Sequence, residues 1–137
     1  MFVIDNQGRT DEACIGDLTV IEAQSAGHSG MLVWGLHRDT TELLNIEVPV
    51  LSYGTCSAGP RRADEPEPDA LVSAQFGDFN VTGDHCVFAD DDGAVFVATA
   101  DVDAVLGTAQ TIRATEEEQA ALVRGGSTLR DQLGFAD

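Results

Sequence analysis

The stretch Ile15–Asp39, IGDLTVIEAQSAGHSGMLVWGLHRD, decides the fold expected for this chain. A short amphipathic helix begins at Asp17, and its end is predicted at Gly27, because glycine adopts a left-handed conformation at little cost. The continuous apolar run from Gly30 to Gly35 is typical of a strand that is buried on both faces. A helix that leads into such a strand indicates a parallel crossover.

Polar residues lie at both ends of this stretch. Arg38 and Asp39 follow the buried strand, and ligands of parallel sheets collect at the carboxyl ends of strands. Asp17 opens the helix, with twenty residues between it and Arg38. The hypothesis is that these three residues meet and hold a metal ion and an anionic substrate. The alternatives are a capping acid at Asp17, and a surface salt bridge or a cap for a short helix Thr40–Leu44 at Arg38-Asp39.

The rest of the first hundred residues predicts more strands. Strands are expected at Phe2–Ile4 and Val48–Tyr53, and Asp11–Gly16 is expected to be a loop or a first helical turn. Two hairpins are expected, Leu71–Phe76 with Phe79–Val81 and His85–Ala89 with Ala94–Ala98. A long loop, Gly54–Asp69, lies between the strand Val48–Tyr53 and the two hairpins. Its Arg61 and Arg62 are either solvated or contact an anion.

A helical tail is expected over about 100–134. Its start would be capped by Thr99 or Asp101, and Ser127 would cap a last short helix that ends at Leu133. The acids Glu116–Glu118 fit a solvated face. Apolar residues recur at helical spacing and are expected to face a core: Val102, Val105, Leu106, Ala109 and Ile112.

Composition limits the class of protein. The length of 137 residues predicts a single domain over 1–137. The net charge is −17 and the chain has no lysine, so neither nucleic acid nor a membrane is expected as a partner. An apolar fraction of 43% argues against disorder, and the acidity favours a halophilic protein whose self-repulsion is screened by salt. No apolar run reaches the length of a membrane span, and three cysteines without CxxC spacing fit a reducing compartment, so a cytoplasmic protein is expected.

The order of these pieces resembles the RraA-like family. It runs G-D-L…A…G…G…G-x-x-R-D, V-P-V, a proline-bearing loop, F-G, G-D and A-D-D-D-G-A-V-F-V, from Phe2 to about Gly134. That family contains 4-hydroxy-4-methyl-2-oxoglutarate aldolases, oxaloacetate decarboxylases and the regulator of ribonuclease activity. The aldolase pattern, Asp then twenty residues then Arg-Asp, is matched by Asp17 and Arg38-Asp39 without a gap. Members usually carry a further segment before the strand that matches Phe2–Ile4, so the chain is expected to be N-terminally short.

The resemblance implies a fold and an assembly. The fold would be α/β, a three-layer β/β/α sandwich of the swivelling-domain kind with a long C-terminal helix. The chain would assemble as a homotrimer or a hexamer, with sites between subunits.

The resemblance also implies the roles of site residues. Asp39 would bind Mg²⁺ or Mn²⁺ directly, Asp17 would bind it through water, and Arg38 would bind the oxygens of a 2-oxo acid. A glutamate of the next subunit would assist proton transfer, with Glu116 the best match and Glu117 or Glu118 left open by the register. The backbone that would bind the substrate carboxylate consists of Ile15, Gly16, Asp17 and Leu18.

Two functions follow from this resemblance. The first is a metal-dependent lyase that cleaves 4-hydroxy-2-oxo di- or tricarboxylic acids to pyruvate by a retro-aldol reaction, or decarboxylates oxaloacetate, through a pyruvate enolate. The second is a non-catalytic regulator of the ribonuclease-regulator type. That branch typically lacks the acid after the arginine, so Asp39 favours the enzyme.

Overall fold

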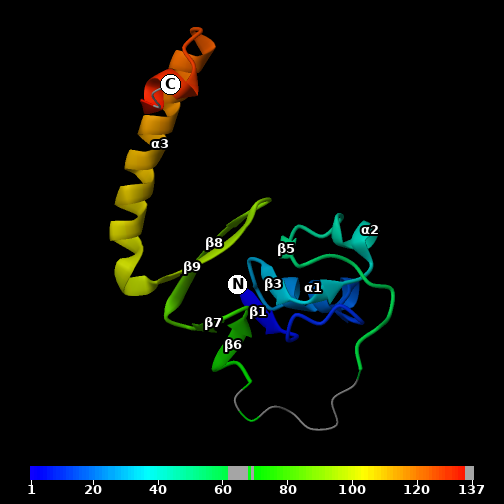
Figure 1. Cartoon of the computed structure of the whole chain (residues 1–137). Coiled ribbons are helices and arrows are strands. Elements are labelled where there is room, and N and C mark those ends of the chain that lie inside the picture. Colours follow the sequence, from blue (N-terminus) through cyan, green and yellow to red (C-terminus); the bar gives the residue numbers. More distant parts are fainter. Residues whose placement is uncertain (62–67, 69, 135–137) are drawn as a thin grey trace. The chain divides into compact units, whose positions relative to one another are not determined.

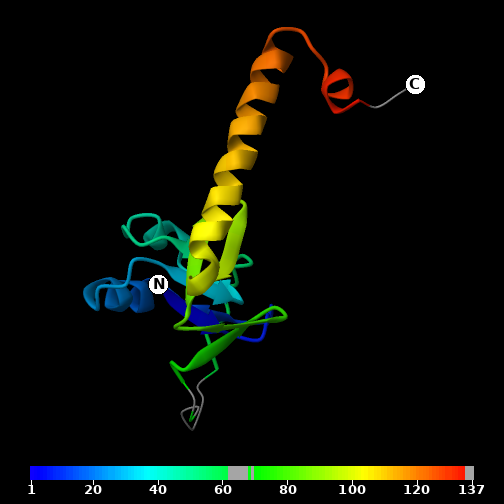
Figure 2. The same ribbon diagram turned by 90° about the vertical axis from the view of Figure 1, so that its left-hand side faces the viewer.

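The computed structural model describes residues 1–61, 68 and 70–134. The chain separates into two compact units, Met1–Phe96 (unit 1) and Val97–Asp137 (unit 2). We describe each unit by itself. Figures 1 and 2 show the strands of unit 1 and the long helix of unit 2.

The centre of unit 1 is a three-stranded parallel sheet in the order β1-β3-β5. It consists of β1 (Phe2–Asp5), β3 (Met31–Trp34) and β5 (Val50–Leu51). Met31, Leu32 and Val33 are at most 1% exposed, which confirms the prediction of a strand buried on both faces. The predicted strand Val48–Tyr53 is shorter than expected, since only two of its residues pair with β3.

A second parallel pair contains the strand β2 (Ala13–Ile15), whose residues were predicted wrongly as a loop or a first helical turn. β2 pairs with β4 (Leu36–His37) directly after β3. The reason for the miss is its length, because three residues are too few to show the alternation of a strand. This pair matters for function, since the carboxyl ends of the parallel strands β2 and β4 lie at the same edge of their sheet.

Two helices follow these strand ends. α1 (Asp17–Ser25) stops before Gly27, whose φ of +82° confirms the predicted left-handed turn. α2 (Thr40–Leu43) follows β4 directly and contacts α1. The core of unit 1 combines both helices with the two sheets, through Ile15, Val20, Ala23, Met31, Val33, Leu43 and Val48.

Both predicted hairpins are present. β6 (Ser73–Phe76) and β7 (Phe79–Thr82) pair antiparallel, and β6 lies beside β1 (Figure 1). β8 (His85–Asp90) and β9 (Gly93–Ala98) form the second hairpin. Aromatic rings connect β6 and β7 to β9, because the Phe96 ring lies 5.4 Å from that of Phe76 and 6.0 Å from that of Phe79.

Unit 2 is helical. A 3₁₀ turn, η1 (Thr99–Asp101), precedes α3 (Val102–Arg124), and α4 (Leu129–Leu133) follows. The α/β class with a long C-terminal helix is therefore confirmed. No helix within the described ranges is long and apolar enough to cross a membrane.

One expectation for unit 2 was wrong, and another stays a prediction. No residue of the described helix α3 is buried within unit 2, and Val105 and Ile112 are 42% and 54% exposed, so the packing of this face on a core stays a prediction. The spacing of apolar residues reports an amphipathic face but not what covers it. The cap of α4 is Thr128, not Ser127. The Thr128 hydroxyl accepts the Asp131 N–H at 3.1 Å, and the Asp131 carboxylate accepts the Thr128 N–H at 3.2 Å.

Candidate functional site

The backbone brings the two ends of the Ile15–Asp39 stretch together. Ile15 pairs with His37 where β2 and β4 end, and the Arg38 N–H donates to the Ile15 carbonyl at 3.0 Å. Gly16 is the N-cap residue of α1, and Asp39 is the N-cap residue of α2. The parallel pairing thus places Arg38 and Asp39 beside the N-terminus of α1.

Gly16 makes room for both side chains. A Cβ at this position would overlap Asp39 Oδ2 and would lie 3.0 Å from Arg38 Nε. These two atoms are 3.3 Å apart in an ion pair whose side chains are 44% exposed at Arg38 and 34% exposed at Asp39. The predicted salt bridge is therefore present, and it lies over Gly16, the N-cap of α1.

Asp39 has an unusual backbone. Its φ of 60° and ψ of 39° are left-handed, a conformation that costs a residue other than glycine on the order of 1 kcal/mol. Asp39 occupies the N-cap position of α2, yet its side chain makes no capping hydrogen bond. The carboxylate lies against Gly16 instead, so the alternative in which its side chain caps α2 is wrong.

Asp17 and Leu18 form the first turn of α1. Asp17 is half-buried, and its Oδ1 accepts the Leu18 N–H at 2.7 Å. The N-cap is Gly16, so Asp17 is the first helical residue and not the cap. A negative charge there is favoured by the helix dipole. Leu18 is 74% exposed, and its N–H, one of the predicted substrate donors, is engaged by Asp17.

His37 fixes the turn that carries Arg38 and Asp39. Its Nδ1 lies 2.7 Å from Ser52 Oγ on one side, and its Nε2 lies 3.0 Å from Thr40 Oγ1 on the other. Burial lowers the pKa of His37 below its ordinary value, because desolvation disfavours the imidazolium. The neutral ring therefore connects β4, the segment after β5 and the start of α2.

Arg61 lies on the long loop and contacts acids of this chain. Its guanidinium Nη2 is 2.8 Å from Asp11 Oδ2, and its Nε is 3.5 Å from Glu12 Oε2. Arg9 contacts the same two acids, which holds the pKa of Asp11 below its usual range, mainly through the hydrogen bond from Arg9. The sequence carries little signal for this cluster, since Arg61 is 49 or more residues away from its other three members. Arg62 lies outside the described residues.

The glutamates expected to complete the site lie on unit 2. Glu116 and Glu118 are exposed on α3, and Glu117 Oε1 accepts a hydrogen bond from Arg113 Nε at 2.8 Å. The approach of Glu116 from a second subunit stays a prediction.

The donor set at Gly16 fits one kind of metal site. Within the described residues no group of three or more His, Cys, Asp or Glu side chains could hold a metal ion by itself. The Asp39 carboxylate lies over Gly16 beside Arg38, and Asp17, which follows Gly16 in the chain, supplies a second carboxylate that contacts the Leu18 N–H. Mg²⁺ keeps several waters and is commonly bound through one or two carboxylates and the substrate, so these residues fit such an ion.

Comparisons with known proteins point to one family. A family model described as RraA-like, Aldolase/RraA, matches residues 1–96. A proposed 4-hydroxy-4-methyl-2-oxoglutarate aldolase of Bacillus anthracis is 32% identical over 95 residues, which is 69% of this chain and 58% of that protein. A similarly named protein of Xanthomonas campestris pv. campestris is 31% identical over 100 residues, 72% of this chain and 58% of that protein. The matched part thus spans a little over half the length of these relatives.

Solved structures show the same fold. The Streptomyces coelicolor protein RraAS2, described as an unusual member of the RNase ES inhibitor RraA protein family, has a TM-score of 0.72 and 28% identity. The match covers 87% of this chain and 60% of that one. An uncharacterised Pseudomonas syringae protein has a TM-score of 0.77 at 23% identity, covering 94% of this chain and 64% of that one, which supports the fold alone. From the family match, the relatives and the shared fold, we conclude that this chain belongs to the RraA-like (Aldolase/RraA) family.

Proposed function

We propose that the chain carries the site of a divalent-metal-dependent lyase that forms pyruvate from 2-oxo acids. The substrates would be 4-hydroxy-2-oxo di- or tricarboxylic acids, cleaved by a retro-aldol reaction, and oxaloacetate, which would lose CO₂. The likeness to relatives named as proposed aldolases supports the reaction class. The natural substrate would be an anion, so it must reach Arg38 against a net charge of −17.

One observation carries this proposal. Arg38 and Asp39 lie together over Gly16, the residue that directly precedes Asp17, at the carboxyl ends of two parallel strands. An arginine that offers several N–H donors next to carboxylates that suit a hard cation is a combination for binding a 2-oxo acid. A surface salt bridge alone does not need glycine beneath it or a strained aspartate within it.

The residues of the chain have distinct roles in this proposal. Arg38 donates hydrogen bonds to the oxygens of the 2-oxo acid and orients the bond to be broken. Asp39 and, through water, Asp17 would hold Mg²⁺ or Mn²⁺, which would supply positive charge to stabilise the negative charge that develops on the substrate. In the retro-aldol case Asp17, through water, accepts the proton of the 4-hydroxyl group, and that oxygen forms a carbonyl group with C4 in the departing product. The C3–C4 bond breaks, and the electrons of this bond form the pyruvate enolate. A proton then adds to C3, which is the step assigned to Glu116.

The test is pyruvate release. Oxaloacetate and 4-hydroxy-4-methyl-2-oxoglutarate are each incubated with the protein in molar KCl, with added Mg²⁺ or with EDTA, and pyruvate is measured by chromatography. We expect turnover with Mg²⁺ only. Arg38→Lys and Asp39→Asn should each lower kcat/KM on the order of 10²-fold or more, and Asp91→Asn, at a hairpin turn, is the matched control.

Asparagine is the right replacement at Asp39, because it tolerates the left-handed backbone that alanine would strain. Turnover that is equal with Mg²⁺ and with EDTA would contradict metal dependence. A folded protein without any turnover would contradict the lyase.

The second candidate function is a regulator of a ribonuclease. The likeness to RraAS2, which is named among RNase ES inhibitor proteins, favours it. In that case the chain would slow RNA cleavage by an RNase E-type enzyme in a purified assay, and Asp39→Asn would inhibit as well as the wild type. Inhibition without pyruvate release would select this function over the lyase.

A further inference from the structure

Glu12 is an unusual residue outside the proposed site. It is 5% exposed and is the one charged residue among the described ones that is classed as buried. Its Oε1 lies 3.1 Å from Arg9 Nη1, and its Oε2 accepts the backbone N–H of Arg61 at 3.2 Å. A buried carboxylate needs such partners, since an unpaired one would be strongly disfavoured.

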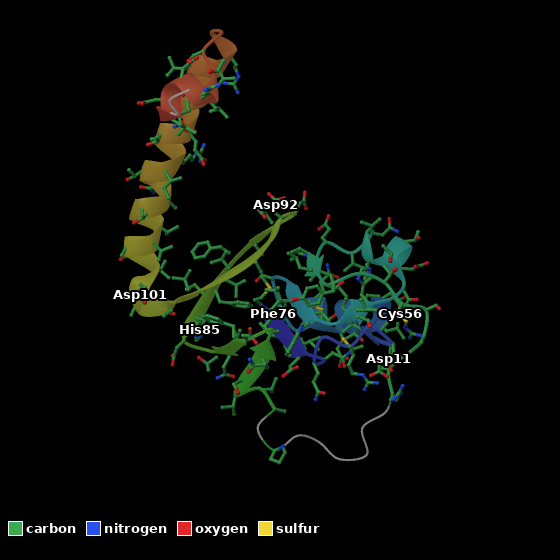
Figure 3. The ribbon with its side chains drawn as sticks, viewed as in Figure 1. Asp11, Cys56, Phe76, His85, Asp92 and Asp101 are labelled. Carbon is green, nitrogen blue, oxygen red and sulfur yellow. The ribbon has the colours of Figure 1, made fainter. Side chains whose placement is uncertain are left out.

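These contacts attach the loop Gly54–Arg61 to the segment before β2. The Ala13 N–H donates to the Ala58 carbonyl at 2.8 Å, next to the contact between Glu12 and the Arg61 backbone. The Arg61 guanidinium adds an ion pair to Asp11. In the view of Figure 3, Asp11 and Cys56 lie at the same edge of unit 1.

The other end of the same loop is attached to β4. The His37 N–H donates to the Gly54 carbonyl, and the Cys56 N–H donates to the His37 carbonyl, both at 2.9 Å. Both ends of the loop are therefore fixed to the strand pair β2–β4, near the end of β4 that Arg38 follows.

Between these attachments the loop passes Arg38. A Cβ at Gly59 would lie 3.5 Å from Arg38 Nη1, just as one at Gly16 would lie 3.0 Å from Arg38 Nε. The backbone thus approaches two different atoms of the guanidinium group, with Gly16 near Nε and Gly59 near Nη1. The Arg38 side chain is 44% exposed, so the loop and the start of α1 cover only part of it.

We propose that Glu12 is a positioning residue for Arg38, acting through the loop Gly54–Arg61. It holds the Arg61 backbone, the loop holds Gly59 against the guanidinium, and Arg38 keeps the orientation in which it binds the 2-oxo acid. The positioning of substrate rests on the proposed function, whereas the positioning of the guanidinium does not.

The first test needs no activity. The chain has seven arginines and no lysine, so the Nε–Hε signals of its arginine side chains give a short NMR spectrum that Arg→Lys variants assign. Glu12→Gln should shift the signals of Arg9 and Arg61, which contact it, and also that of Arg38, which does not. Glu22→Gln makes the same exchange on the exposed face of α1 and should leave all three unchanged.

If Glu12→Gln does not fold, judged by circular dichroism, Arg61→Pro replaces it, because proline lacks the backbone N–H that Glu12 accepts, and the Arg61 side chain is 72% exposed. That variant should also shift the Arg38 signal. A shift at Arg9 and Arg61 with an unchanged Arg38 signal would overturn the inference and leave Glu12 a purely structural residue.

The second test uses turnover. With oxaloacetate as the probe, Glu12→Gln should raise KM on the order of 10-fold and change kcat much less, because Arg38 is misplaced but not removed. A loss of kcat at constant KM would overturn the role in substrate positioning. If the wild type has no turnover, the proposed function fails by itself, and the Arg38 signal still decides whether Glu12 positions this side chain.

Discussion

Replacing Gly16 by alanine tests the geometry of the site with one methyl group. The new Cβ would overlap Asp39 Oδ2 and come within 3.0 Å of Arg38 Nε, so both side chains must move. The backbone itself accepts alanine, because the φ of −147° and ψ of −169° at Gly16 are those of extended chain. The change is therefore local to the ion pair.

The expected cost to stability is small. Alanine is a poorer N-cap than glycine, which should destabilise α1 by about 0.5–1 kcal/mol. Arg38 and Asp39 are 44% and 34% exposed, so they can turn into solvent without disturbing the core. A domain with about 5–15 kcal/mol of stability stays folded after such a loss.

The expected cost to activity is large. Asp39 Oδ2 must retreat by roughly 1 Å, and misplacement of that size can cost about 10²-fold in rate. We therefore expect kcat/KM for oxaloacetate to fall about 100-fold while the urea midpoint shifts only slightly.

Pyruvate release and urea unfolding, measured on the same sample, separate the two effects. Gly83→Ala is the control, since its Cβ would meet nothing within 4 Å. A Gly16→Ala protein with the wild-type kcat/KM would refute the reasoning, because the space over Gly16 would then have no part in the reaction.

Three further predictions concern stability. Gly107→Ala, in the middle of α3 with open space around the new Cβ, should stabilise the helix by about 0.5–1 kcal/mol, which a thermal melt followed by circular dichroism at 222 nm would detect as a higher Tm. Burial lowers the pKa of His37, so the unfolded chain takes up its proton first, and the urea midpoint should drop as the pH falls through the ordinary histidine pKa of about 6.5 and drop less in His37→Asn. The net charge of −17 predicts a higher Tm in molar KCl than in dilute buffer, and an equal Tm would contradict adaptation to salt.

Part of this fold follows directly from local sequence. The apolar run Gly30–Gly35 predicts a strand buried on both faces, and Met31–Trp34 is that strand, in the middle of its sheet. Gly27 predicts the end of α1, because a helix commonly ends at a residue in the left-handed conformation and glycine adopts it at little cost. These features depend on a few consecutive residues, so they can be predicted from the sequence alone.

Other features depend on residues far apart in the chain. β2 is too short to be read as a strand, and it exists because β4 pairs with it. The burial of Glu12 depends on Arg61, and no local pattern distinguishes it from its exposed neighbour Asp11. At the site, the spacing of Asp17 and Arg38 predicts that these residues lie close together. The approach of the Arg38 and Asp39 side chains to Gly16 is visible only in the folded structure.

The single tryptophan has a consequence for how unfolding is observed. Trp34 ends β3, and its indole lies against Gly8, where a Cβ would come within 2.7 Å of Nε1. The only tyrosine, Tyr53, is in the same unit. Intrinsic fluorescence therefore reports on unit 1, whereas ellipticity at 222 nm is dominated by α3 of unit 2. Coincident fluorescence and ellipticity transitions would show one cooperative protein, and separate transitions would show two parts that melt independently.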